Sequence, residues 1–235
     1  MQDLEEFQNK IGVRFKDKEL LERVFIHRSY LNEHKELRKE HNERLEFLGD
    51  AVLELTVTCF LYDNFRKPEG EMTAWRSALV KGESLSREAK RLGMNGLIRT
   101  SRGEARNVGK ARDLILANAF EALIGAIYLD QGFSVASEFV EKNICYKLNE
   151  ILEQGLYYDP KSRFQELSQE SLGVTPTYEV ISEEGPDHAK IFCVGAYLDE
   201  NQVAKGVGPS KQRAQTEAAR KALESWDKII KSASR

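Results

Sequence analysis

The sequence has no long apolar run and few cysteines, and both absences exclude classes of protein. No stretch of about 18 apolar residues occurs in the 235-residue chain, which argues against a membrane-spanning helix. Its acidic start, Met-Gln-Asp-Leu-Glu-Glu, is unlike a secretory signal peptide, so we expect a cytoplasmic protein. Cys59, Cys145 and Cys193 form no Cys-x-x-Cys or Cys/His pair at zinc spacing, and we expect buried, reduced thiols.

The chain also lacks an excess of positive charge, since its formal net charge is -3. That value by itself argues mildly against a nucleic-acid partner. The distribution is uneven, however. Residues 203–235 hold 8 Lys and Arg against 3 Asp and Glu, whereas residues 158–202 hold 3 against 9. A cationic patch is therefore expected only near the C-terminus.

Residues 1–155 read as an all-α domain. Apolar side chains recur at helical spacing, period-two alternation is almost absent, and turn formers such as Lys67-Pro68-Glu69-Gly70 separate the helical stretches. The expected helices lie near 20, at about 38–64, 72–92 and 112–130, and at 134–153.

After a linker at 156–160, residues 161–231 read as a second, α-β-β-β-α domain. A helix over 162–170 is followed by three alternating segments at 177–181, 190–198 and 202–207, which predict a three-stranded antiparallel sheet. The last helix begins near Pro209-Ser210, a favourable capping pair. The fold class is therefore α+β with two domains.

Three carboxylates stand out in the helix expected at 38–64. Glu43, Glu46 and Asp50 are spaced i, i+3 and i+7, so they share one helical face. Leu45, Leu48, Val52 and Leu55 give the same helix an apolar stripe. Clustered like charges destabilise a helix, and a bound divalent cation would reverse that effect.

A second helix supplies further ligands. Asn118 and Glu121 are spaced i and i+3 within an apolar helix that also contains Gly125. Small residues on both helices, Gly49 and Gly125, would let the backbones approach closely. We therefore expect Glu46, Asp50, Asn118 and Glu121 to form one site. Glu69, at the expected start of the next helix, is a further acid, although the helix dipole alone accounts for it equally well.

Several segments resemble the ribonuclease III family. Asn42 to Leu53 matches the family signature almost letter for letter, and Ile26-His27-Arg28-Ser29-Tyr30 and Phe120 to Asp130 match further family blocks. The C-terminal half is similar to the double-stranded RNA-binding domain of bacterial members. The resemblance implies a Mg²⁺-dependent endonuclease, with Mn²⁺ a plausible substitute and no organic cofactor. It implies a homodimer that acts in RNA processing and cuts both strands of duplex RNA, leaving 5′-phosphates and short 3′ overhangs.

Residue by residue, the resemblance makes Glu46, Asp50 and Glu121 metal ligands and places Glu43 and Glu69 in the cleavage valley. It makes Phe47 a dimer contact that inserts into a pocket of the partner subunit. In the C-terminal half, RNA contacts are expected from three places: a first helix, a loop between two strands and the start of the last helix. Their residues are Gln165 and Glu166, His188, and Ser210, Lys211 and Arg213.

One position departs from the family pattern. Asn118 stands where members usually carry aspartate, so the site has one negative charge fewer, although the amide oxygen can still coordinate a hard cation. The sequence leaves open whether the amide is natural variation or an introduced change. It also leaves open two other functions: a catalytically impaired dimeric RNA-binding protein, and a helical metal phosphohydrolase for small substrates.

Overall fold

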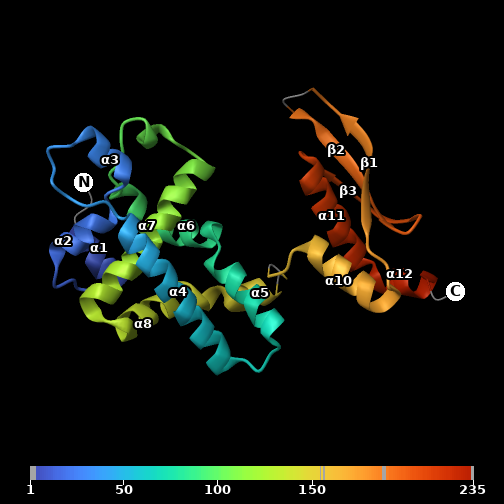
Figure 1. Ribbon diagram of the computed structural model, residues 1–235, viewed down its shortest axis with the longest axis horizontal. Helices are drawn as coiled ribbons and strands as arrows, with labels where there is room; N and C mark the ends of the chain where they lie inside the picture. The colour runs from blue at the N-terminus through green and yellow to red at the C-terminus, as the bar shows by residue number, and fades with distance from the viewer. Residues whose placement is uncertain (1–3, 154, 156, 187–188, 234–235) are drawn as a thin grey trace. The chain divides into compact units, whose positions relative to one another are not determined.

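The computed structural model describes residues 4–153, 155, 157–186 and 189–233 (Figure 1). It divides into two compact units, Met1–Tyr157 and Tyr158–Arg235. The first is built from helices, and the second combines helices with a three-stranded sheet, which confirms the expected fold class. No helix within the described ranges is long and apolar enough to cross a membrane.

The first unit is organised around two helices of 22 residues each, α4 and α7, which pack against each other at its centre (Figure 1). Half of the 22 residues of α7 are buried, in a nearly continuous run from Ile115 to Ile127, so this helix forms the axis of the hydrophobic core. In chain order the helices are α1 (Leu4–Ile11), α2 (Lys18–Val24), α3 (Arg28–Glu33), α4 (Glu43–Asn64), α5 (Glu69–Val80), α6 (Gly82–Arg91), the 3₁₀ turns η1 (Met94–Gly96) and η2 (Glu104–Arg106), α7 (Lys110–Gln131), α8 (Phe133–Asn143), η3 (Cys145–Lys147) and α9 (Leu148–Glu153).

Two expected helices are each divided in the structure. The segment 72–92 forms α5 and α6, which are separated at Lys81 because its backbone is extended, with φ -58° and ψ 142°. The segment 134–153 forms α8 and α9, which are separated by η3. In both cases the apolar residues on either side of the break stay buried in one core, so sequence spacing alone shows no interruption.

Two expectations for α4 were wrong. Leu55, assigned to the inward stripe, is 53% exposed, and Cys59, expected to be buried, is exposed as well. The helix is apolar on more than one side, so its sequence does not say which apolar side faces the core. Leu45, Val52 and Leu53 are buried, which leaves Leu55 and Cys59 on the opposite, solvent-facing side.

The second unit has the predicted order, with one additional helix. It comprises α10 (Pro160–Leu172), β1 (Thr177–Glu184), β2 (Ile191–Leu198), β3 (Asn201–Gly208), α11 (Lys211–Glu224) and α12 (Trp226–Ala233). The strands pair antiparallel in the order β1-β2-β3. The side chains of Val194 and Ala196 on β2 are buried, and α11 packs against this strand. A Cβ on Gly206 would lie 2.2 Å from the carbonyl oxygen of Ala214, so α11 rests directly on β3.

Candidate functional site

The backbones of α4 and α7 approach each other closely at two glycines. A Cβ on Gly49 would lie 1.8 Å from the backbone oxygen of Glu121, and a Cβ on Gly125 would lie 2.2 Å from that of Leu45. Both distances are far below any real Cβ contact, so only glycine allows the two backbones to meet here. The expected close approach is confirmed, and it brings the acidic residues of the two helices together.

The start of α4 is fixed by Asn42. The buried Asn42 side chain donates from Nδ2 to the Val24 carbonyl at 3.0 Å, and its backbone N–H donates to the Ile26 carbonyl at 2.9 Å. These bonds hold the first turn of α4, which carries Glu43 and Glu46, against the end of α2 and the residues that follow it. Asn42 lies within the segment that resembles the family signature, but this role was not predicted from the sequence.

Three acidic side chains from the two helices interact electrostatically at this crossing. Burial raises the pKa of Glu121 to about 7, and the charges of Asp50 and Glu46 add to the effect. Burial also raises the pKa of Glu46, together with the charges of Glu43 and Asp50. The carboxylates therefore repel one another at neutral pH, and a cation between them would relieve that repulsion.

Asn118 reaches the same cluster. A side-chain hydrogen bond with Asn118 lowers the pKa of Glu46 and so favours its charged form. The amide nitrogen is the only donor group of this side chain, so the bond directs that nitrogen toward the Glu46 carboxylate. The carbonyl oxygen of Asn118 remains the atom that suits a hard cation.

The donor set fits a hydrated hard cation. Carboxylate and amide oxygens are the ligands that Mg²⁺ prefers, and this ion usually keeps several waters while binding one or two carboxylates. Among the described residues, no group of three or more His, Cys, Asp and Glu side chains is arranged to hold a metal ion.

Glu43 and Glu69 occupy different surroundings. Glu43 lies at the start of α4, 3.5 Å from Arg28 Nε and within the electrostatic reach of Glu46. Glu69 lies at the first position of α5, where Thr73 Oγ1 donates to its carboxylate at 3.2 Å. It lines a hollow of about 150 Å³ together with residues of α4 and α5, among them Thr58, Tyr62, Met72 and Arg76.

The face of α4 that lies away from the core carries exposed apolar side chains. Phe47 is 82% exposed, and Leu55 and Tyr62 lie 53% and 64% exposed two and four turns further along the helix. An exposed apolar stripe on a helix is typical of an interface. Of these three residues, only Phe47 was predicted to lie at an interface. The signal for Leu55 and Tyr62 is that apolar residues recur on more than one side of this helix.

The expected RNA-binding residues lie on the surface of the second unit. Gln165 and Glu166 are exposed on α10, where Arg163 pairs with Glu166 at 3.4 Å. Ser210 caps α11 by accepting a hydrogen bond from the backbone N–H of Arg213 at 3.2 Å. Lys211 is the first residue of that helix. His188, which was also predicted to bind RNA, lies outside the described residues.

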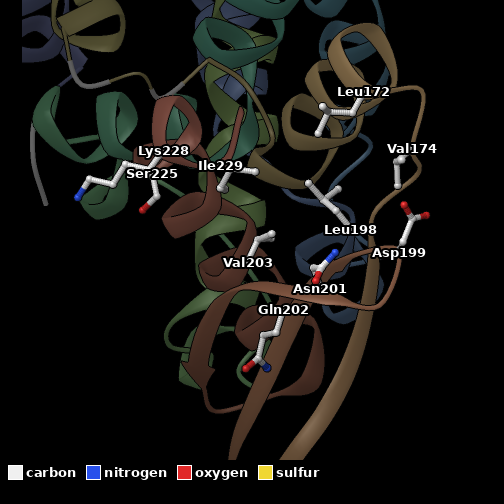
Figure 2. A pocket seen from close by; sticks show the side chains of 10 residues that line it. All are labelled: Leu172, Val174, Leu198, Asp199, Asn201, Gln202, Val203, Ser225, Lys228 and Ile229. Atoms are coloured by element: carbon white, nitrogen blue, oxygen red, sulfur yellow. The ribbon is translucent and has the colours of Figure 1, made fainter. Parts of the chain in front are cut away.

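A hollow of about 740 Å³ opens elsewhere on the second unit, and Figure 2 shows the side chains that line it. It lies beside the turn between β2 and β3, where Asp199 adopts a positive φ of 51°. Leu198, Val203 and Ile229 contribute its apolar part. None of the predicted RNA-binding residues lines it, so we assign it no part in the site.

Both units of the chain match known protein families. Residues 17–148 match the family model described as Ribonuclease-III-like, and residues 160–225 match the double-stranded RNA binding motif. The chain is 43% identical over 221 residues to Ribonuclease 3 of Geobacillus kaustophilus, covering 94% of this chain and 89% of that protein. It is 41% identical over 215 residues to Ribonuclease 3 of Protochlamydia amoebophila, covering 91% and 88%. A structure of the nuclease domain of ribonuclease III from Campylobacter jejuni aligns with a TM-score of 0.54 at 38% identity, covering 60% of this chain and 98% of that chain.

Proposed function

Because the chain belongs to the ribonuclease III family and carries a double-stranded RNA-binding domain, we propose that it is a Mg²⁺-dependent endoribonuclease that cuts both strands of duplex RNA. The observation that carries the proposal is the meeting of Glu46, Asp50 and Glu121 at the glycine-lined crossing of α4 and α7. The products would be 5′-phosphates with short 3′ overhangs, and the reaction would belong to RNA processing.

The proposed site residues would have different roles in hydrolysis. Glu46, Asp50, Glu121 and the oxygen of Asn118 would hold the Mg²⁺. When bound, the ion supplies an activated water near neutral pH and stabilises the charge on the leaving oxygen. Glu43 and Glu69 would line the path of the RNA strand and orient water. Gln165, Glu166, His188, Ser210, Lys211 and Arg213 would hold the duplex through its minor grooves and phosphates.

Asn118 favours a second candidate, a dimeric RNA-binding protein with impaired catalysis, because the site lacks one of the usual negative charges. The two candidates differ in a direct assay on a long, perfectly paired RNA with Mg²⁺. We expect the chain to cleave it, and Asn118→Asp to cleave faster and to bind Mg²⁺ more tightly in a calorimetric titration. Asn118→Ala, which has no ligand oxygen, should cleave more slowly than the parent chain.

If the parent chain leaves the duplex intact over hours and Asn118→Asp restores cleavage, the second candidate is correct for this chain. Retention of the parent rate by Asn118→Ala would show instead that the amide oxygen is not a ligand.

We further propose that two copies pair through the exposed face of α4. The hollow of about 150 Å³ described above lies on this face, where Leu61, Tyr62 and Met72 line it. A cavity of this volume accepts a ring of benzene size. If Phe47 of one copy enters that hollow on the other, Glu69, which lines it, would lie near the partner's acidic crossing. This arrangement would explain why Glu69 stands apart from the cluster within a single chain.

Phe47→Ala should therefore dissociate the dimer. Truncation of a central aromatic anchor costs at least about 2 kcal/mol, which corresponds to a roughly 30-fold weaker association. Sedimentation equilibrium of the parent and variant measures the effect. Val108→Ala is the matched control, because Val108 is 84% exposed but lies outside α4 and α5. Equal association constants for Phe47→Ala and the parent would rule out this interface.

A further inference from the structure

The first residue of α11, Lys211, is engaged by an acidic side chain from the sheet. Lys211 Nζ lies 2.8 Å from Oε1 of Glu183, which stands near the end of β1. The second carboxylate oxygen of Glu183 lies 3.7 Å from Lys190 Nζ. Lys211, on which the proposed phosphate contact depends, is therefore already paired with the Glu183 carboxylate.

The pairing is built into the sheet. Glu183 lies directly opposite Phe192 in the β1–β2 register, and Lys211 Nζ lies 5.5 Å from the centroid of the Phe192 ring. The ring thus contacts the ammonium while the carboxylate beside it supplies the charge. The cross-strand register fixes Glu183 and Phe192 relative to each other, so Lys211 is held between them.

The position of Lys211 at a helix N-terminus explains why a nearby anion stabilises it. A cation at a helix N-terminus is opposed by the helix dipole, whereas an anion there is favoured. Lys211 is more than half exposed, so it can exchange one anion for another without unfolding its surroundings. Hydrogen bonding to Lys211 is the largest cause of the lowered pKa of Glu183, so that carboxylate stays charged at neutral pH.

We propose that Glu183 is an affinity-limiting residue for duplex RNA, because a backbone phosphate must displace its carboxylate from Lys211. The inference rests on the proposed function, since it assumes that Lys211 contacts RNA phosphate. In the free protein, Glu183 neutralises Lys211 and holds it in place. In the complex, the displaced carboxylate remains close to the phosphate and repels it. The residue therefore weakens RNA binding and favours release of the cleaved product.

The test is a binding titration of the full chain with a labelled, perfectly paired RNA duplex in EDTA, which prevents metal-dependent cleavage. Glu183→Gln should bind roughly two- to fivefold more tightly than the parent, as expected for removal of one exposed ionic competitor. The slope of log affinity against log salt concentration should become steeper by up to about one, the change expected for one additional phosphate contact. Glu179→Gln is the matched control, because Glu179 is exposed on the same strand and loses the same charge.

A second pair of variants isolates the role of Lys211. In the Lys211→Met background, Glu183→Gln should not increase the affinity for RNA, because there is no ammonium group left for which carboxylate and phosphate compete. The inference is overturned if Glu183→Gln equals Glu179→Gln, if it binds RNA more weakly than the parent, or if its gain persists without Lys211. If the parent chain fails to bind the duplex at all, the proposed function itself is wrong. Circular dichroism melting of each variant verifies that it is folded.

Discussion

Glu121→Gln is expected to abolish RNA cleavage and, at the same time, to make the metal-free protein more stable above neutral pH. Glutamine keeps the shape of the side chain but not its charge. A metal contributes several kcal/mol to phosphodiester hydrolysis, and each 1.36 kcal/mol is a factor of ten in rate, so we expect a loss of roughly a thousandfold or more. The gain in stability follows from the electrostatics of the site.

The sign of the stability effect comes from the pKa. Burial and the neighbouring carboxylates raise the pKa of Glu121 from 4.5 to about 7, so the folded chain holds this proton more tightly than the unfolded chain. The resulting stability is fully present below pH 4.5 and is lost as the pH rises through about 7. Glutamine cannot ionise, so the variant lacks this loss. The difference between variant and parent should therefore grow between pH 4.5 and 8.

Thermal unfolding in EDTA across this pH range measures the effect, and a single-turnover cleavage assay with Mg²⁺ measures the rate. Glu138→Gln, on the exposed side of α8, is the control and should leave both properties unchanged. A variant that cleaves at the parent rate would remove Glu121 from the proposed metal site. A variant with the parent's pH profile of stability would show that Glu121 titrates normally.

Gly49→Ala is expected to lower the free energy of unfolding of the first unit strongly, although it adds only one methyl group. Its Cβ would lie 1.8 Å from the backbone oxygen and 2.6 Å from the backbone carbon of Glu121. Side chains can move away from an added methyl group, but a helix backbone cannot do so without displacing α7. Overpacking usually costs about 1–3 kcal/mol. Here we expect about 3 kcal/mol or more, because two helices must separate.

The separation should also remove cleavage activity, since Glu46 and Asp50 on α4 would move away from Glu121. Chemical denaturation monitored by circular dichroism gives the free energy of unfolding. Gly70→Ala is the control: Gly70 is also helical, but a Cβ there meets no atom within 4 Å. The control should be neutral or slightly stabilising, since alanine favours helices more than glycine does. Equal stability of the two variants would contradict the close crossing.

The sequence predicted the elements whose signals are local. Helical spacing located α4 and α7, alternation located the three strands, and Ser210 marked the start of α11. The break at Lys81 and the exposure of Leu55 were not predicted. Each depends on which apolar side chains face the core, and spacing along the chain is the same whichever face is buried. The short helix α12 was also missed. It packs against the rest of the second unit through Trp226, whose ring centroid lies 5.9 Å from that of Phe164.

By itself, the sequence determined which chemical groups are present and which of them share a helix face, because these properties depend only on residue type and on the helical repeat. Glu43, Glu46 and Asp50 could be assigned to one face of α4 on that basis. Only the tertiary structure decided that Glu121 sits close enough to these acids for its pKa to rise to about 7, and that Glu183 pairs with Lys211. Both depend on contacts between segments distant in the chain, where backbone approach at Gly49 and strand register at Phe192 set the distances.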